Sequence, residues 1–195
     1  MRSLAREISH CTLCAQRFAA THTAHAPRPV VWFDNAARIL VAGQAPGLKV
    51  HQSGRPFTDP SGDRLRAWMG IGTDTFYDRS KIAIVPMAFC FPGYSAKGSD
   101  LPPPTICART WRRQVMSELK NIKLTIVIGG YAMRYHLGRK VPVSQAVADY
   151  KTWGDDIFAL PHPSWRNTGW LKKNPWFTDT VVPRLQGRIQ EVLND

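Results

Sequence analysis

The sequence predicts an α/β protein: a three-layer α/β/α sandwich around a central four-stranded parallel sheet. Four short apolar runs rich in β-branched residues have the length of buried strands, and stretches with helical spacing lie between them. Strands that alternate with helices are typical of a parallel sheet covered on both faces. With 195 residues and 44% hydrophobic content the chain can form a core, and we expect a single domain over residues 1–195.

Each expected element has the length and composition of its class. The strands are residues 38–42 (RILVA), 82–86 (IAIVP), 124–128 (LTIVI) and 157–160 (IFAL). Helices are expected near residues 62–69, 107–119, 131–137 and 182–193. Parallel sheets bind their ligands beyond the carboxyl ends of the strands. The loops at 43–47, 87–93 and 161–167 begin at that edge, so we expect the functional site there.

The charge of the chain points to a polyanionic partner. Lysine and arginine number 26 against 14 acidic residues, which gives a net charge of +12. Such an excess attracts nucleic acid, although a basic surface can also serve solubility alone. The basic residues are spread along the chain, which favours a folded binding face over a disordered arm. No apolar run approaches the roughly 20 residues that span a bilayer. The first residues do not resemble a signal peptide, so we expect a cytoplasmic protein without membrane contact.

Four cysteines form a candidate metal site: Cys11, Cys14, Cys90 and Cys107. The first two make a C-x-x-C pair, and the last two are too far apart to be diagnostic. Four thiolates can hold a tetrahedral zinc ion or an iron–sulfur cluster, and the spacing does not separate these alternatives. Buried free thiols are a third possibility. Disulfides are disfavoured in a chain without a secretion signal.

A glycine-rich loop follows the first expected strand. It lacks the Gly-Lys-Ser/Thr ending of a phosphate loop and the G-x-G-x-x-G of a dinucleotide site. Together with other motifs, however, it resembles the iron–sulfur uracil-DNA glycosylases, which carry such motifs in the same order at similar spacing. These motifs are Cys11-Thr12-Leu13-Cys14, Gly43-Gln44-Ala45-Pro46-Gly47, Gly54-Arg55-Pro56-Phe57, Cys90-Phe91-Pro92, Cys107 and His162-Pro163-Ser164. The resemblance covers nearly the whole chain, and longer strings resemble a proteobacterial subgroup of uracil-DNA glycosylase family proteins.

The resemblance implies an activity and a cofactor. We expect a monomeric enzyme that excises uracil, or a related deaminated base, from DNA by hydrolysing the N-glycosidic bond and so initiates base excision repair. A 4Fe-4S cluster held by the four cysteines is expected, with zinc the less favoured occupant. The cluster's task is expected to be structural, because glycosidic cleavage needs no redox step.

The resemblance also implies residue roles. Phe57 is expected to stack on the flipped base, and His162 to stabilise the anion of the departing base. Gln44 is expected to order water, because an amide cannot be a strong base. Substrate binding is further assigned to Gly43, Ala45, Pro46, Gly47 and Ser164. DNA binding is assigned to Trp165, Arg166, Asn167, Lys172 and Lys173, with Trp165 or Arg166 as a wedge in the duplex. The structural alternatives are a core aromatic for Phe57, a tight turn for His162 and packing for Trp170 and Trp176.

Several positions depart from the family pattern. Gln44 stands where the family usually has glutamate, and Ala45 where the best-known class has aspartate. Pro86 replaces the asparagine that reads the uracil edge, and His51 replaces an acidic residue. Since histidine titrates near neutrality, we expect His51 to position or activate water. Asp59 and Asp63 are substitutes for the missing acids, or a turn residue and a helix-start residue.

These departures leave other functions open. One alternative is a DNA-binding protein of the same fold without glycosylase activity. Another is a glycosylase for hypoxanthine or xanthine. A third is a zinc-stabilised hydrolase of a small nucleotide, with His51 and His162 as acid and base.

Overall fold

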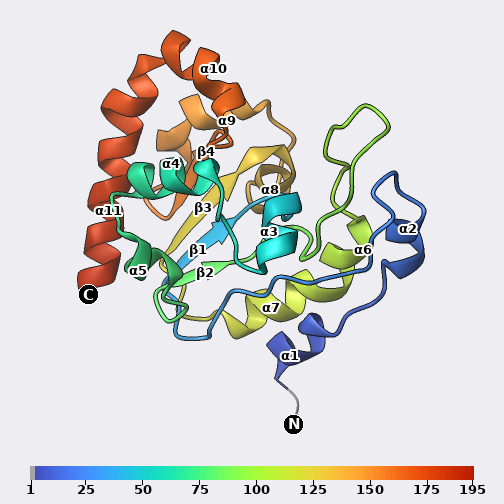
Figure 1. Ribbon diagram of the computed structural model, residues 1–195. Coiled ribbons are helices and arrows are strands. Elements are labelled where there is room, and N and C mark those ends of the chain that lie inside the picture. The colour runs from blue at the N-terminus through green and yellow to red at the C-terminus, as the bar shows by residue number, and fades with distance from the viewer. Residues whose placement is uncertain (1–2) are drawn as a thin grey trace.

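A four-stranded parallel sheet forms the centre of the computed structural model, which describes residues 3–195 (Figure 1). The strands are β1 (Ile39–Ala42), β2 (Ile82–Ile84), β3 (Leu124–Ile128) and β4 (Ile157–Leu160), in the order β2-β1-β3-β4. Val41 pairs with Ile84 on one side and with Ile126 on the other. The predicted fold class is confirmed: helices flank the sheet on both sides, as Figure 1 shows.

The strands end close to where the sequence predicts. β2 stops at Ile84, two residues earlier than expected. Hydrogen bonds to the β1 side nevertheless continue, because the amide of Val85 donates to the carbonyl of Val41 and that of Met87 to the carbonyl of Gly43, both at 2.9 Å. Pro86 lies between these two donors and has no amide hydrogen of its own. All four residues of β1 are buried, because this central strand is covered on both faces.

The expected helices are present with different bounds. They are α4 (Pro60–Met69), α6 (Thr105–Cys107) with α7 (Arg113–Glu118), α8 (Gly129–His136) and α11 (Val182–Asn194). The helix expected over 107–119 is interrupted by a π-helical turn, η1 (Ala108–Arg112). A second π-helical turn, η4 (Phe177–Val181), precedes α11. Such turns insert a residue into the helix and often occur near functional sites.

The remaining helices are short and lack a predictable period. They are α1 (Leu4–Ser9), α2 (Ala15–Ala19), α3 (Leu48–Ser53), α5 (Thr73–Tyr77), α9 (Val143–Ala148), α10 (Thr168–Lys173), η2 (Tyr150–Trp153) and η3 (Trp165–Asn167). α4 packs on α11, and α11 also contacts β3. Within residues 3–195 no helix has both the length and the apolar character needed to cross a membrane.

α4 matters most for the site, and its sequence explains both of its ends. Asp59 caps the amino terminus by accepting a hydrogen bond from the amide of Ser61 at 3.0 Å, and Pro60 occupies the first turn. Gly70 ends the helix in the left-handed conformation, with φ of 64°. Asp59 is therefore a helix cap, whereas the structural alternative considered for it was a turn residue.

Candidate active site and cysteine pocket

The loops after β1 and β2 lie side by side at the carboxyl edge of the sheet. The amide of Met87 donates to the carbonyl of Gly43 at 2.9 Å, and the amide of Ala88 donates to that of Gln44 at 3.1 Å. A Cβ atom added at Gly43 or Gly47 would meet no heavy atom within 4 Å, so space in front of this loop is open. Glycine at such positions lets a ligand approach the backbone closely. Pro46 is buried, while Gln44 and Ala45 are half-buried.

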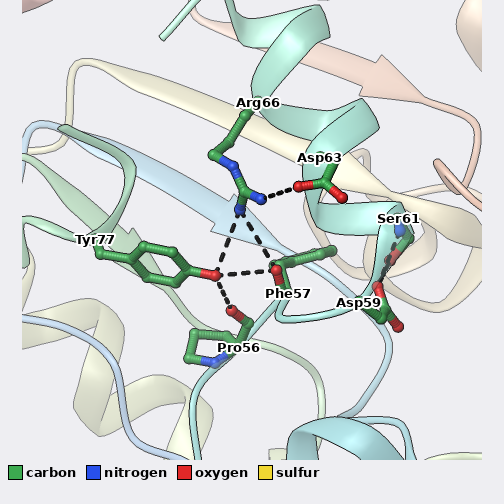
Figure 2. Close-up of polar contacts among 7 residues, drawn as sticks. All are labelled: Pro56, Phe57, Asp59, Ser61, Asp63, Arg66 and Tyr77. Atoms are coloured by element: carbon green, nitrogen blue, oxygen red, sulfur yellow. Dashed lines mark hydrogen bonds and ion pairs between the residues drawn. The ribbon is translucent and has the colours of Figure 1, made fainter. Parts of the chain in front are cut away.

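Phe57 lies between α3 and α4 in an unusual backbone conformation. Its φ is +53°, in the left-handed region that non-glycine residues rarely adopt. The side chain is half-buried, and its ring meets that of Phe76 edge-on with centroids 6.0 Å apart. Figure 2 shows its carbonyl held by Tyr77 and Arg66. Strained residues of this kind concentrate at ligand-binding sites, which agrees with a functional role better than with plain core packing.

His162 follows β4 and remains exposed. Protein nevertheless surrounds the ring closely enough for burial to lower its pKa, against the opposing effect of the Asp59 and Asp100 carboxylates. The imidazole is therefore neutral at neutral pH and retains one N–H donor.

The loop that carries His162 is anchored at two points. Arg64 of α4 donates from Nη1 to the carbonyl of Ser164 at 2.9 Å. The side-chain amide of Asn167, a residue expected to bind DNA, donates to the carbonyl of His162 at 2.7 Å. Arg64 was not predicted, because nothing in the local sequence signals a partner one hundred residues away.

The residues beyond this loop divide into exposed and packed groups. Trp165 is 74% exposed, and Arg166, Lys172 and Lys173 are also exposed. They are therefore free to contact a partner. Trp170 and Trp176 are half-buried, and their rings meet edge to face with centroids 5.9 Å apart. Their indole nitrogens donate to Ser144 Oγ and Asn174 Oδ1. These two tryptophans serve packing.

His51 lies in α3 with its ring turned toward two other rings. It meets His25 edge-on at 5.2 Å and Phe91 at 5.9 Å. Burial, followed by the nearby His25 and Arg28, lowers its pKa, and its buried Nδ1 has no hydrogen-bond partner in the described part of the chain. Within residues 3–195 no hydrogen bond or ring contact joins His51 to His162. The structure thus does not pair the two histidines as acid and base.

The four cysteines line one pocket. The rest of the lining is apolar and comes from residues 8–29 and 88–111: Ile8, Leu13, Phe18, Pro27, Pro29, Ala88, Phe89, Pro104 and Trp111. None of the four forms a disulfide. Burial, followed by Cys107, raises the pKa of Cys90 to about 12, and burial raises that of Cys107 to about 11. In residues 3–195 no three His, Cys, Asp or Glu side chains are grouped closely enough to hold a metal ion.

A neighbouring residue, His25, connects this pocket with α3, and the sequence reasoning missed it. Its ring stacks on Phe18 of the pocket with centroids 4.9 Å apart, and its Nε2 lies 3.0 Å from the carbonyl of Phe91. The edge contact with His51 continues this chain of rings. The pocket and the loop side of the sheet are therefore packed together through His25.

The parallel sheet, with an accessible histidine and an open glycine loop at its carboxyl edge, defines an α/β protein whose candidate site lies at that edge. A model of the uracil DNA glycosylase superfamily matches residues 30–186. The chain therefore belongs to the uracil DNA glycosylase superfamily, whose members are DNA glycosylases. Cys90 and Cys107 lie within the matched residues, whereas Cys11 and Cys14 precede them.

Proposed function

We propose that the protein is a DNA glycosylase that excises uracil, or a related deaminated base, by hydrolysing the N-glycosidic bond, and so initiates base excision repair. The observation that carries this proposal is that α4, which begins three residues after Phe57, is joined to the loop of His162. Arg64 ties these two segments together through Ser164. A base rotated out of the duplex would find a ring to stack on and a neutral donor in one place.

The chemistry follows from the state of His162. Cleavage leaves negative charge on the departing base, and a donor placed at the oxygen where that charge develops lowers the barrier. A neutral imidazole keeps one N–H group, which can donate a hydrogen bond to that oxygen. Gln44 supplies an amide beside the open loop that orients water but cannot abstract its proton. The peptide groups of residues 43–47 border the sugar.

DNA binding would use the exposed residues after His162. Trp165 is large, aromatic and exposed, so it can fill the gap that a rotated base leaves in the stack. Arg166 lies beside it with its guanidinium 5.9 Å from the indole centroid. Lys172 and Lys173 would meet phosphates and fix the register without reading the sequence.

We further propose that Cys11, Cys14, Cys90 and Cys107 hold a 4Fe-4S cluster. The pocket supports this, because all four thiols line it and the rest of the wall is apolar. Trp111, also on this wall, has a buried indole N–H without an acceptor in residues 3–195, which a cluster sulfur would satisfy. A zinc ion would need four sulfurs within about 4 Å of one another, since each Zn–S bond is about 2.3 Å. A 4Fe-4S cluster would accept ligands that are further apart, because it places iron and sulfide between them.

When bound, the cluster would supply a cross-link between the amino-terminal segment and residues 90–107. It would take no part in the cleavage step. Loss of the cluster would instead weaken the packing of Phe18 on His25 and of His25 on His51 in α3.

One observation favours a different base. Pro86 follows β2 where relatives carry the uracil-reading asparagine, and its carbonyl already accepts from Arg112 Nη1 at 3.1 Å. The position therefore lacks an amide that could select uracil. A glycosylase for hypoxanthine or xanthine, or a DNA binder without activity, would follow from the same geometry.

A panel of labelled oligonucleotides tests these alternatives together. Each oligonucleotide carries one uracil, hypoxanthine or xanthine, in single-stranded and duplex form, and alkali reveals abasic sites. Release of uracil supports a uracil-DNA glycosylase. Release of hypoxanthine or xanthine alone supports a glycosylase for that purine. Tight DNA binding without release of any base would leave only the DNA-binding function.

A further inference from the structure

Phe57 is held in a conformation that its own side chain disfavours. In the left-handed region the Cβ atom of an L-residue approaches the following carbonyl oxygen too closely. Among residues 3–195, only Ala24 and Phe57 adopt positive φ without being glycine. Such a conformation persists only where the surroundings determine it.

Hydrogen bonds to the Phe57 carbonyl hold the residue in this conformation. The Tyr77 hydroxyl lies 2.9 Å from the carbonyl oxygens of both Pro56 and Phe57 and donates its single proton to this pair. Arg66 Nη1 lies 3.4 Å from the Phe57 oxygen, while its Nη2 contacts Asp63 at 2.6 Å. Figure 2 shows Tyr77 and Arg66 converging on this one carbonyl.

Two features keep this arrangement rigid. Tyr77 is enclosed by rings: Trp32 at 5.6 Å and Phe76 at 5.1 Å, both edge-on. The guanidinium of Arg55 lies over its face at 3.5 Å. The Phe57 carbonyl also packs closely against Gly62 of α4. A Cβ atom at position 62 would lie 1.9 Å from the Phe57 oxygen, so any residue other than glycine would clash with it. Tyr77 therefore has little freedom to leave the carbonyl.

We propose that Tyr77, supported by Arg66, is a positioning residue that holds the Phe57 peptide in its left-handed conformation and thereby presents the ring for stacking on a flipped base. This inference rests on the proposed function. Without the hydroxyl, Phe57 relaxes to negative φ, and the ring turns away from the place where His162 and the glycine loop meet a base.

The experiment compares Tyr77→Phe, which removes one oxygen atom, with Tyr150→Phe, a half-buried tyrosine of η2, as control. We expect the single-turnover rate of base release at saturating substrate to fall about tenfold in Tyr77→Phe, while Kd for undamaged DNA stays unchanged. In a Phe57→Ala background the same substitution should have no further effect, because contacts that act through one residue are not additive. A tenfold loss that persists without the ring would overturn the positioning role.

A crystal structure of the Tyr77→Phe variant supplies a readout that does not need activity. The inference expects Phe57 at negative φ in that variant and at positive φ in Tyr150→Phe. An unchanged positive φ in Tyr77→Phe overturns the inference, whatever the activity. If Phe57 moves but the wild-type protein releases no base, the positioning role stands and the proposed function fails.

Discussion

Arg64 donates a hydrogen bond from Nη1 to the backbone carbonyl of Ser164 at 2.9 Å, one hundred residues further along the chain. The same guanidinium approaches Thr168 Oγ1 at 3.4 Å. The contact joins α4, which begins three residues after Phe57, to the loop that carries His162. It therefore sets the separation between the two side chains on which the proposed chemistry depends.

Removing this contact should lower both activity and stability. We expect Arg64→Met to lose about 1–2 kcal/mol of unfolding free energy, as for a hydrogen bond with a charged donor. The single-turnover rate should fall about tenfold, because the His162 loop is no longer fixed to α4. Urea unfolding and base-release assays measure the two effects. Arg134→Met on α8, where the arginine is exposed, is the control; equal rates in the two variants would remove Arg64 from the account.

Two helical glycines should respond to alanine with opposite signs. A Cβ atom at Gly62 would lie 1.9 Å from the backbone oxygen of Phe57, so Gly62→Ala should cost about 1–3 kcal/mol and displace Phe57. A Cβ atom at Gly187 of α11 meets nothing within 4 Å, and alanine there should stabilise by about 0.5–1 kcal/mol. Thermal or urea unfolding measures both. A neutral Gly62→Ala would show that the backbone approach is not tight.

The pH profile of cleavage should report the neutral form of His162. Burial lowers its pKa below the usual 6.5, although Asp59 and Asp100 act in the opposite sense. The rate should therefore stay level as pH falls from 8 to 6.5 and decline only as pH falls through the lowered pKa. Single-turnover rates across this range decide the point. A rate that rises on acidification near pH 6.5 would mean that the imidazolium is the active form.

The cysteines should act as one unit in metal binding. We expect Cys90→Ser to lose iron, sulfide and stability, because ligand loss opens the cluster and binding contributes to folding. Cys11→Ser should behave alike, although Cys11 precedes the residues that match the family. Iron and sulfide analysis of anaerobically purified protein is the measurement. One zinc per chain without iron would refute the cluster, as would full iron retention in either variant.

Much of the fold could be predicted from sequence because its signals are local. The runs at 124–128 and 157–160 are short, apolar and rich in β-branched residues, and they form β3 and β4 with the expected bounds. The π-helical turn at Ala108–Arg112 was missed, since a helical period does not reveal one inserted residue. Several short helices carry no period to detect, and the surrounding protein stabilises them.

The site was predictable in position but not in its contacts. The loops that leave β1 and β4 were expected to hold Gln44 and His162, because parallel strands end at one edge. The left-handed conformation of Phe57 was not predicted, because it depends on Tyr77, twenty residues away. The contacts of His51 with His25 and Phe91 were not predicted either, since tertiary contacts decide where a helix points its side chains.

The central claim is that His162 stabilises the charge on a departing base. It is tested most directly by single-turnover uracil release from a labelled oligonucleotide, comparing wild-type protein with His162→Ala at equal iron content. We predict rapid release by the wild-type protein and a rate at least about a hundredfold lower in the variant. Equal rates in the two proteins would contradict the role of His162, and no release of any deaminated base by wild-type protein with its cofactor intact would contradict the glycosylase itself.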